Sequence, residues 1–147
     1  MTMQHISQFD TIGWDIDGTL LNGPASYKIR DFIFKNPQKK HYLVTFRTGD
    51  LLKQTESHMA SFGYKDLKIF KKILSVPENI WLNYIVVEDQ NRRNKNNKLS
   101  FPHLQFMEWK GYICKMEGIP ILVDDDIERT ERGCIRYGIK LFDSTIL

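Results

Sequence analysis

Cysteine is scarce in this sequence, and long runs of apolar residues are absent. Only two cysteines occur among 147 residues, Cys114 and Cys134, and they are far from a Cys-x-x-Cys spacing. We therefore expect a reduced, cytoplasmic chain rather than a disulfide scaffold or a structural zinc site. The apolar stretches are too short to cross a bilayer, and the N-terminal segment lacks a basic head and an apolar core. Neither a membrane span nor a signal peptide is expected.

A large excess of one charge is also missing. The chain has 21 Lys and Arg against 18 Asp and Glu, and a net charge of +3 is too mild to imply nucleic-acid binding. With 41% hydrophobic and 27% charged residues, the composition is that of a globular protein, which argues against disorder, collagen or repeats. The length fits one domain, residues 1–147. The four histidines are scattered and suggest no ligand set.

Short apolar runs alternate with helical patterns along the chain. Strands are predicted at 9–15, 41–46, 67–70, 119–123 and 139–142. Helices are predicted from Ser26, from an N-cap at Asp50, over 103–117 and over 127–137. The run from Ile80 to Val87 fits a strand or a helix equally, and 90–100 is expected to be a polar loop. Alternation of this kind predicts an α/β fold: a central, mainly parallel five-stranded sheet between two layers of helices.

Polar residues follow three of these predicted strands. Asp15 and Asp17 end the first strand, Thr45 ends the second, and three aspartates, 124–126, follow the fourth. In parallel α/β sheets, ligands bind at the carboxyl ends of the strands. Carboxylates that share one edge need a cation nearby or shifted pKa values, and oxygen ligands without nitrogen or sulfur favour Mg²⁺. Lys110, fourteen residues before Asp124, would add an ammonium group, which completes the parts needed to handle a phosphate.

The segment WDIDGTLL, residues 14–21, resembles the first motif of the haloacid dehalogenase (HAD) superfamily, whose phosphatases carry DxDGT after the first strand. The later motifs follow in the superfamily's order: LVT at 43–45, a lysine, and ILVDDD at 121–126. The resemblance extends from about residue 10 to residue 142. It implies a Rossmann-like HAD fold and a Mg²⁺-dependent phosphomonoester hydrolase. The acid at position 17 disfavours the dehalogenase branch, which lacks it.

The resemblance also assigns roles to individual residues. Asp15 would attack phosphorus and form an aspartyl-phosphate, and Asp17 would act as general acid and then general base. Thr45 would hydrogen-bond the phosphoryl group, and Lys110 would neutralise charge on nucleophile and phosphate. The Mg²⁺ ligands would be Asp15, the backbone carbonyl of Asp17, and Asp124 or Asp125. Asp126 is expected to cap the following helix.

Several assignments at this edge stay open in the sequence. Gly18 and the turn after it would offer backbone N–H groups to the phosphate. Phe46 and Arg47 follow Thr45 and would face the substrate, although a surface arginine fits Arg47 nearly as well. Lys98 and Lys115 are rivals of Lys110 for the role of the motif lysine.

The intervals after the first two motifs are too short for a separate cap domain. About twenty residues separate Leu21 from His41, and the stretch 85–103 is expected to be a loop at most. This layout is similar to capless phosphatases of the polynucleotide 3′-phosphatase and deoxyribonucleotidase kind, so a nucleotide or a nucleic-acid end is the expected substrate. Four basic residues would bind a polyanion or form a solvated loop: Arg92, Arg93, Lys95 and Lys98.

Two other functions use similar residues or the same fold. A phospho-receiver domain also uses acids, a threonine and a lysine, but its paired acids precede its phospho-acceptor, the reverse of the order here. A catalytically weak HAD-fold protein with a binding or regulatory role is the remaining alternative. The intact Asp15, Asp17 and Thr45 argue against it.

Overall fold

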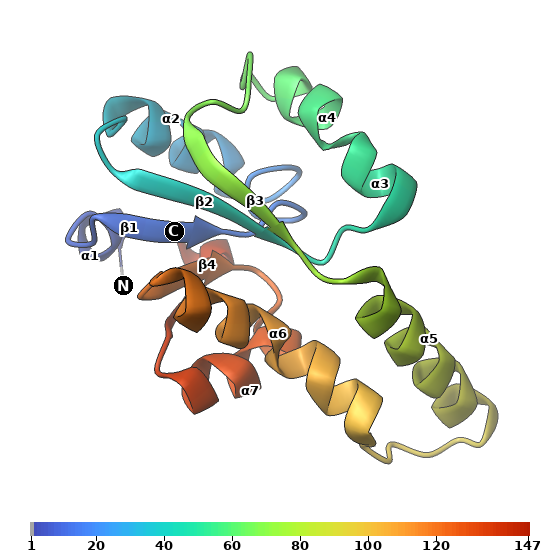
Figure 1. Cartoon of the computed structure of the whole chain (residues 1–147). Coiled ribbons are helices and arrows are strands. Elements are labelled where there is room, and N and C mark those ends of the chain that lie inside the picture. The colour runs from blue at the N-terminus through green and yellow to red at the C-terminus, as the bar shows by residue number, and fades with distance from the viewer. Residues whose placement is uncertain (1) are drawn as a thin grey trace.

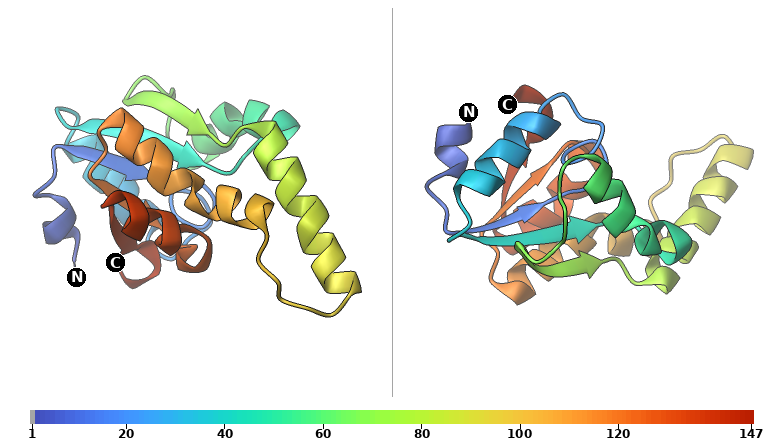
Figure 2. Two further views of the ribbon diagram at one scale, coloured as in Figure 1. Left: turned by 60° about the horizontal axis from the view of Figure 1, so that its bottom comes forward. Right: turned by 90° about the horizontal axis from the view of Figure 1, so that it is seen from above.

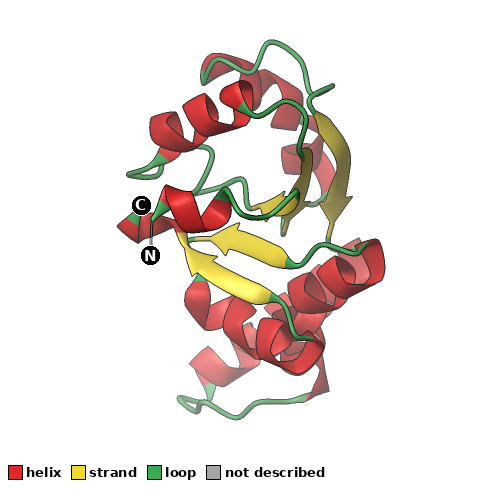
Figure 3. Cartoon of the chain, turned by 90° about the vertical axis from the view of Figure 1, so that its left-hand side faces the viewer, coloured by secondary structure: helices red, strands yellow, loops and turns green. Residues whose placement is uncertain are grey.

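The computed structural model describes residues 2–147 and shows a five-stranded, entirely parallel sheet with helices on both faces (Figures 1 and 3). The elements are α1 Met3–Ile6, β1 Thr11–Trp14, α2 Ser26–Lys35, β2 Lys40–Thr45, α3 Gly49–Lys53, α4 Thr55–Ser61, β3 Phe70–Ser75, α5 Glu78–Arg93, α6 Phe101–Glu117, β4 Ile121–Asp124, α7 Ile127–Tyr137, β5 Lys140–Asp143 and the 3₁₀ turn η1 Ser144–Ile146. The strand order is β3-β2-β1-β4-β5. The predicted α/β class and parallel sheet are confirmed.

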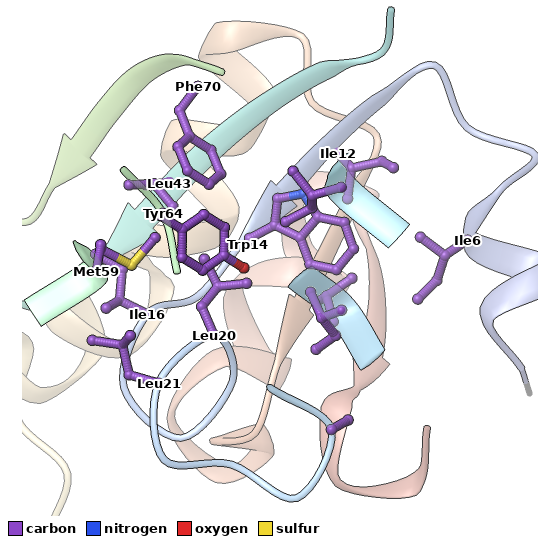
Figure 4. Packing of buried hydrophobic residues seen from close by; sticks show 14 of the residues in the cluster. Ile6, Ile12, Trp14, Ile16, Leu20, Leu21, Leu43, Met59, Tyr64 and Phe70 are labelled. Atoms are coloured by element: carbon purple, nitrogen blue, oxygen red, sulfur yellow. The ribbon is translucent and has the colours of Figure 1, made fainter. Parts of the chain in front are cut away.

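Two hydrophobic cores occupy the two faces of the sheet because side chains alternate along each strand. On one face, Ile12 and Trp14 of β1 pack with Leu43 of β2 and with residues from α2 and α4, such as Met59 (Figure 4). On the other face, Val44 and Leu122 lie beneath α6 and α7. Both cysteines are buried in this second core, Cys114 on α6 and Cys134 on α7.

β1 lies in the middle of the sheet, between β2 and β4. Trp14 is in register with Leu43 on one side and with Val123 on the other. The carboxyl ends of three adjacent strands therefore meet, which brings the polar residues after β1, β2 and β4 to one place on the edge of the sheet.

Two predicted elements have different bounds in the structure. The third strand is Phe70–Ser75 instead of 67–70, because residues 66–69 form a turn in which the Asp66 carboxylate accepts the Lys68 N–H. The helix expected from Asp50 is divided into α3 and α4. Its N-cap is Thr48, and Asp50 lies in the first turn of α3.

The region that the sequence left open is a helix. Residues 78–93 form α5, so residues 90–93, expected in a loop, are helical. The stretch 85–103, expected to be a loop at most, carries the second half of α5. The physical reason is a stripe at helical spacing: Trp81 and Tyr84 both contact Phe106 of α6, and the Tyr84 ring stacks on it at 4.0 Å. Together α5 and the first turns of α6 project from the sheet as an arm whose tip is the loop 94–100, whereas the rest of α6 packs on the sheet (Figures 1 and 2).

Most of α5 faces solvent. It has no buried residue, and its outward side chains include Leu82 and Val86, which are 52% and 54% exposed. Within residues 2–147, the structure has no helix that is long and apolar enough to cross a membrane.

Candidate active site

A hollow of about 350 Å³ lies where the carboxyl ends of β1, β2 and β4 meet. Its walls come from segments far apart in the sequence: the turn after β1, the start of α3, the first turn of α5, the middle of α6 and the turn after β4. Every side chain that the sequence singled out as catalytic or metal-binding lines this hollow: Asp15, Asp17, Thr45, Lys110, Asp124 and Asp125.

Lys110 forms the centre of the site. Its side chain is only 1% exposed, and its Nζ donates to Oδ1 of Asp15 at 2.8 Å and to Oδ2 of Asp124 at 2.7 Å. The Nζ also lies 4.4 Å from the centre of the Phe46 ring, a cation–π distance. An ammonium group with these partners is held in one position, between the strand ends of β1 and β4.

The buried charges of this group shift one another's pKa values. Burial raises the pKa of Asp15 well above its usual range, although Lys110 opposes the shift. Asp124 follows the same pattern, with burial raising its pKa and Lys110 lowering it. Burial alone would lower the pKa of Lys110, but Asp15 and Asp124 outweigh this and raise it. Lys110 therefore stays an ammonium, and the two carboxylates lie where further positive charge is favourable.

Asp125 adds a third carboxylate beside this pair. Asp15, Asp124 and Asp125 each offer an oxygen, and the three oxygens lie within 4.8 Å of one another. Gly18 lies against Asp125 with φ +81°, and a Cβ at this glycine would collide with the carboxylate. A glycine is required here both for the backbone angle and for space. An all-oxygen donor set of this size suits a hard divalent cation such as Mg²⁺.

The turn after β1 uses its own N–H groups internally. The Gly18 N–H, expected to face a phosphate, donates instead to the Leu21 carbonyl at 2.7 Å, and the Thr19 N–H donates to Ile16. Gly18 itself is not among the lining residues of the hollow. In the structure this glycine lets the chain pass Asp125; a phosphate-binding N–H at this residue stays a prediction.

Asp17 lies nearer to solvent than Asp15, with 54% of its side chain exposed. Arg47 binds the Asp17 carboxylate through two hydrogen bonds: Nε donates to Oδ2 at 2.8 Å, and Nη2 donates to Oδ1 at 2.7 Å. Arg47 is itself only 4% exposed, and its Nη1 donates to the Leu51 carbonyl at 3.3 Å. It is thus a buried arginine that fixes the plane of the Asp17 carboxylate, not a surface arginine.

Thr45 and Phe46 complete the wall from β2. Thr45 is fully buried, and its Oγ1 accepts the Arg47 N–H at 3.0 Å, which leaves the hydroxyl proton free to donate. The Phe46 ring stacks on Phe106 at 4.1 Å. Asp126 also lines the hollow, and its side chain accepts the Arg129 N–H as the N-cap of α7, as expected.

The basic candidates from the rest of the chain lie elsewhere. Lys115 is exposed near the end of α6, and Lys98 is in the loop at the tip of the arm. Arg92 and Arg93 end α5, and both form ion pairs with Asp89. With Lys95 and Lys98 they surround the tip of the arm, and none of the four lines the hollow.

Sequence reasoning gave no role to several residues of the site. The Thr19 hydroxyl donates to Oδ2 of Asp15 at 3.1 Å and is part of the DGT segment, so the motif itself contained the signal. Leu51, Trp81 and Arg129 line the hollow as well. Trp81 lies in the stretch whose secondary structure the sequence left undecided, and no motif marks it.

Comparison of this chain with models of protein families, with curated proteins and with solved structures finds no match. The resemblance of its motifs to the HAD superfamily therefore rests on the residues of the sequence alone.

Proposed function

We propose that this chain is a Mg²⁺-dependent phosphomonoester hydrolase of the HAD type. The observation that carries the proposal is the buried Lys110 ammonium, 2.8 Å from Asp15 and 2.7 Å from Asp124, at the floor of a hollow that also contains Asp17, Thr45 and Asp125. A structural lysine would need only one carboxylate partner. Here one ammonium holds two of the three clustered carboxylates, the arrangement needed for a dianionic phosphate and its counter-cation.

Asp15 is the proposed nucleophile. Lys110 holds one of its oxygens and the Thr19 hydroxyl holds the other, so the carboxylate has a fixed orientation. An oxygen of Asp15 attacks phosphorus in line, a bond from Asp15 to phosphorus forms, and the bond from phosphorus to the leaving oxygen breaks. The Thr45 hydroxyl and the Lys110 ammonium stabilise charge on the phosphoryl oxygens during this step.

Asp17 is the proposed general acid and base. The protonated form of Asp17 gives its proton to the leaving oxygen in the first step, and the carboxylate so formed takes a proton from water in the second. That water attacks phosphorus, releases inorganic phosphate and restores Asp15. Arg47 holds the Asp17 carboxylate at the side of the hollow through two hydrogen bonds. Removal of Arg47 would therefore disturb the position of the acid without touching the nucleophile.

Asp15, Asp124 and Asp125 would hold Mg²⁺, together with the backbone carbonyl of Asp17. Their oxygens lie within 4.8 Å of one another, and all are hard donors. When bound, Mg²⁺ would supply positive charge that offsets the repulsion between these carboxylates and the phosphate. The raised pKa values of Asp15 and Asp124, caused first by burial, fit a site in which added positive charge is favourable.

Release of phosphate from p-nitrophenyl phosphate, with Mg²⁺ and with EDTA, tests the proposal. We expect turnover with Mg²⁺ and its loss with EDTA. Asp125→Asn should raise the Mg²⁺ concentration needed for half-maximal rate, whereas the matched Asp126→Asn variant should not, because asparagine also caps a helix. Full turnover in EDTA would contradict the metal assignment. No turnover under any condition would favour the alternative, a HAD-fold protein that binds or regulates without hydrolysis.

A nucleotide or a nucleic-acid end remains the proposed kind of substrate. Contacts of Arg92, Arg93, Lys95 and Lys98 with a polyanion belong to this proposal, but these residues do not line the hollow, and Asp89 pairs with the two arginines. The side chains that line the hollow are closer to the expected position of the leaving group.

A further inference from the structure

The hollow has a second half that the reaction does not use. Its apolar lining consists of Phe46, whose ring lies against the Lys110 ammonium, and of Leu51 and Trp81. Leu51 is 45% exposed, and Trp81 is only partly buried, whereas Trp14 and Trp109 are 0% and 6% exposed. Of the three tryptophans, Trp81 is the most exposed, and it lines the same hollow as the proposed catalytic groups.

The fold holds the Trp81 ring in place from behind. Trp81 lies in the first turn of α5, directly after β3. Its ring centre is 5.5 Å from Phe106 on α6 and 6.0 Å from Tyr84 on its own helix. These contacts hold a ring that also lines the hollow. A tryptophan held in this way is a rigid platform that loses little conformational entropy when a ligand covers it.

In-line attack by Asp15 directs the leaving group toward the apolar half of the hollow. Attack by Asp15 from the floor of the hollow requires the leaving oxygen on the far side of phosphorus, where Asp17 protonates it. The organic part of the substrate then extends toward the mouth, past Leu51 and Trp81. A small polyol would leave these apolar surfaces in water, whereas a planar ring would cover them and stack on the indole.

We propose that Trp81 selects phosphomonoesters whose leaving group carries a planar ring, a nucleobase or an aryl group. This inference rests on the function proposed above and adds the class of leaving group to it. Stacking on an aromatic side chain tolerates any ring with a π face, so both sources share one chemistry. The experiment below distinguishes them.

The test compares three substrates, adenosine 5′-monophosphate, phenyl phosphate and glycerol 3-phosphate, in the wild type and in Trp81→Ala. We expect kcat/KM for the two ring substrates to fall by roughly 5- to 100-fold in Trp81→Ala, the range for loss of one stacked base. The value for glycerol phosphate should stay within about twofold, which also shows that the variant is folded. Trp81→Phe should retain most of the preference. Leu82→Ala, the next residue on α5, is outside the hollow and should change nothing.

The pattern of losses identifies the ring. A loss confined to the nucleotide assigns the platform to a base, and a loss confined to phenyl phosphate assigns it to an aryl group; either supports the inference. Equal losses for all three substrates would show a general role of Trp81 and overturn it. Unchanged values for both ring substrates would overturn it as well.

A binding measurement separates this inference from the proposed function. Calorimetric titration of the Asp15→Asn protein with the same three compounds, in Mg²⁺, measures ring recognition without turnover. The two ring compounds should bind at least about fivefold more tightly than glycerol phosphate, and Trp81→Ala should abolish the difference. Equal affinities would overturn the inference even if the wild type is a phosphatase. A ring preference in a wild-type protein that hydrolyses nothing would leave the inference standing and refute the phosphatase.

Discussion

The two sides of the hollow are built in different ways. On the sheet side, Asp15, Lys110 and Asp124 are almost fully buried and joined by two short ion pairs. On the arm side, Trp81 comes from α5, a helix with no buried residue. The first side depends on the core of the molecule, and the second depends on one layer of aromatic contacts. The groups proposed to do the chemistry are thus held by the core of the fold, whereas the wall proposed to face the leaving group is free to vary.

The largest effect should come from the sheet side, at the nucleophile. Asp15→Asn should lower kcat for every phosphomonoester by at least ~10³, a loss of about 4 kcal/mol of transition-state stabilisation. The substitution is nearly isosteric, so the fold should persist. The measurement is steady-state phosphate release. Asp10→Asn, at the other end of β1 and fully exposed, is the matched control and should be fully active. An active Asp15→Asn protein, with asparagine verified by mass spectrometry, would refute the covalent mechanism.

Removal of the ammonium should cost stability as well as activity. Lys110→Met leaves two buried carboxylates without their shared partner, which should lower the free energy of unfolding by about 3–5 kcal/mol. Urea denaturation of both proteins measures this loss. Lys115→Met, one turn and a half later on α6 and exposed, should leave the midpoint unchanged. Equal stability of the two variants would mean that Lys110 does not hold the strand ends together.

These two sides also differ in how well the sequence predicted them. Asp15, Thr45 and Asp124 follow apolar strands directly, so their positions follow from the rule that parallel strands end at one edge. Lys110 was predicted from its spacing to Asp124, and the structure places it between the two carboxylates. The sheet itself was predicted correctly, with one strand displaced.

The arm side could not be predicted, for a physical reason. The run from Ile80 to Val87 is apolar on more than one face of α5, with Leu82 and Val86 exposed, so its periodicity does not separate helix from strand. The helix is favoured by its contact with Phe106, a residue more than twenty positions away in the sequence. The hydrogen bonds from Arg47 to Asp17 likewise join residues that are distant in the sequence, and no local pattern indicates them.

Between the two sides, Asp17 should show an effect that depends on the leaving group. Asp17→Asn removes the proton donor, so alkyl phosphates should react about 10²-fold or more slowly, whereas p-nitrophenolate leaves without protonation and its release should survive in part. The second step also lacks its base, so phosphate should accumulate on Asp15. Mass spectrometry of the quenched variant should show one added phosphoryl group. The Asp15→Asn, Asp17→Asn double variant is the control and should show none; equal slowing of both substrate types would remove Asp17 from the acid role.

The smallest effect is expected at the tip of the arm, and it tests whether the arm side extends beyond Trp81. Replacing Arg92, Arg93, Lys95 and Lys98 with serine should not change turnover of p-nitrophenyl phosphate, because none of the four lines the hollow. If a nucleic-acid strand lies along the arm, kcat/KM for a 3′-phosphorylated oligonucleotide should fall by about 10-fold or less. The dependence on salt should become flatter, because fewer counterions are released on binding.

The matched control for the arm has the same change in charge elsewhere on the surface. Lys35, Lys65, Lys68 and Lys71 are exposed, and none of them lines the hollow. Serine at these four positions lowers the net charge equally, so any effect of overall charge on oligonucleotide kinetics appears in both variants. A flatter salt dependence only in the arm variant assigns the phosphate contacts to the arm tip. Equal salt dependence in both variants would exclude such contacts and confine substrate recognition to the hollow, where Asp89 would then serve only to neutralise Arg92 and Arg93.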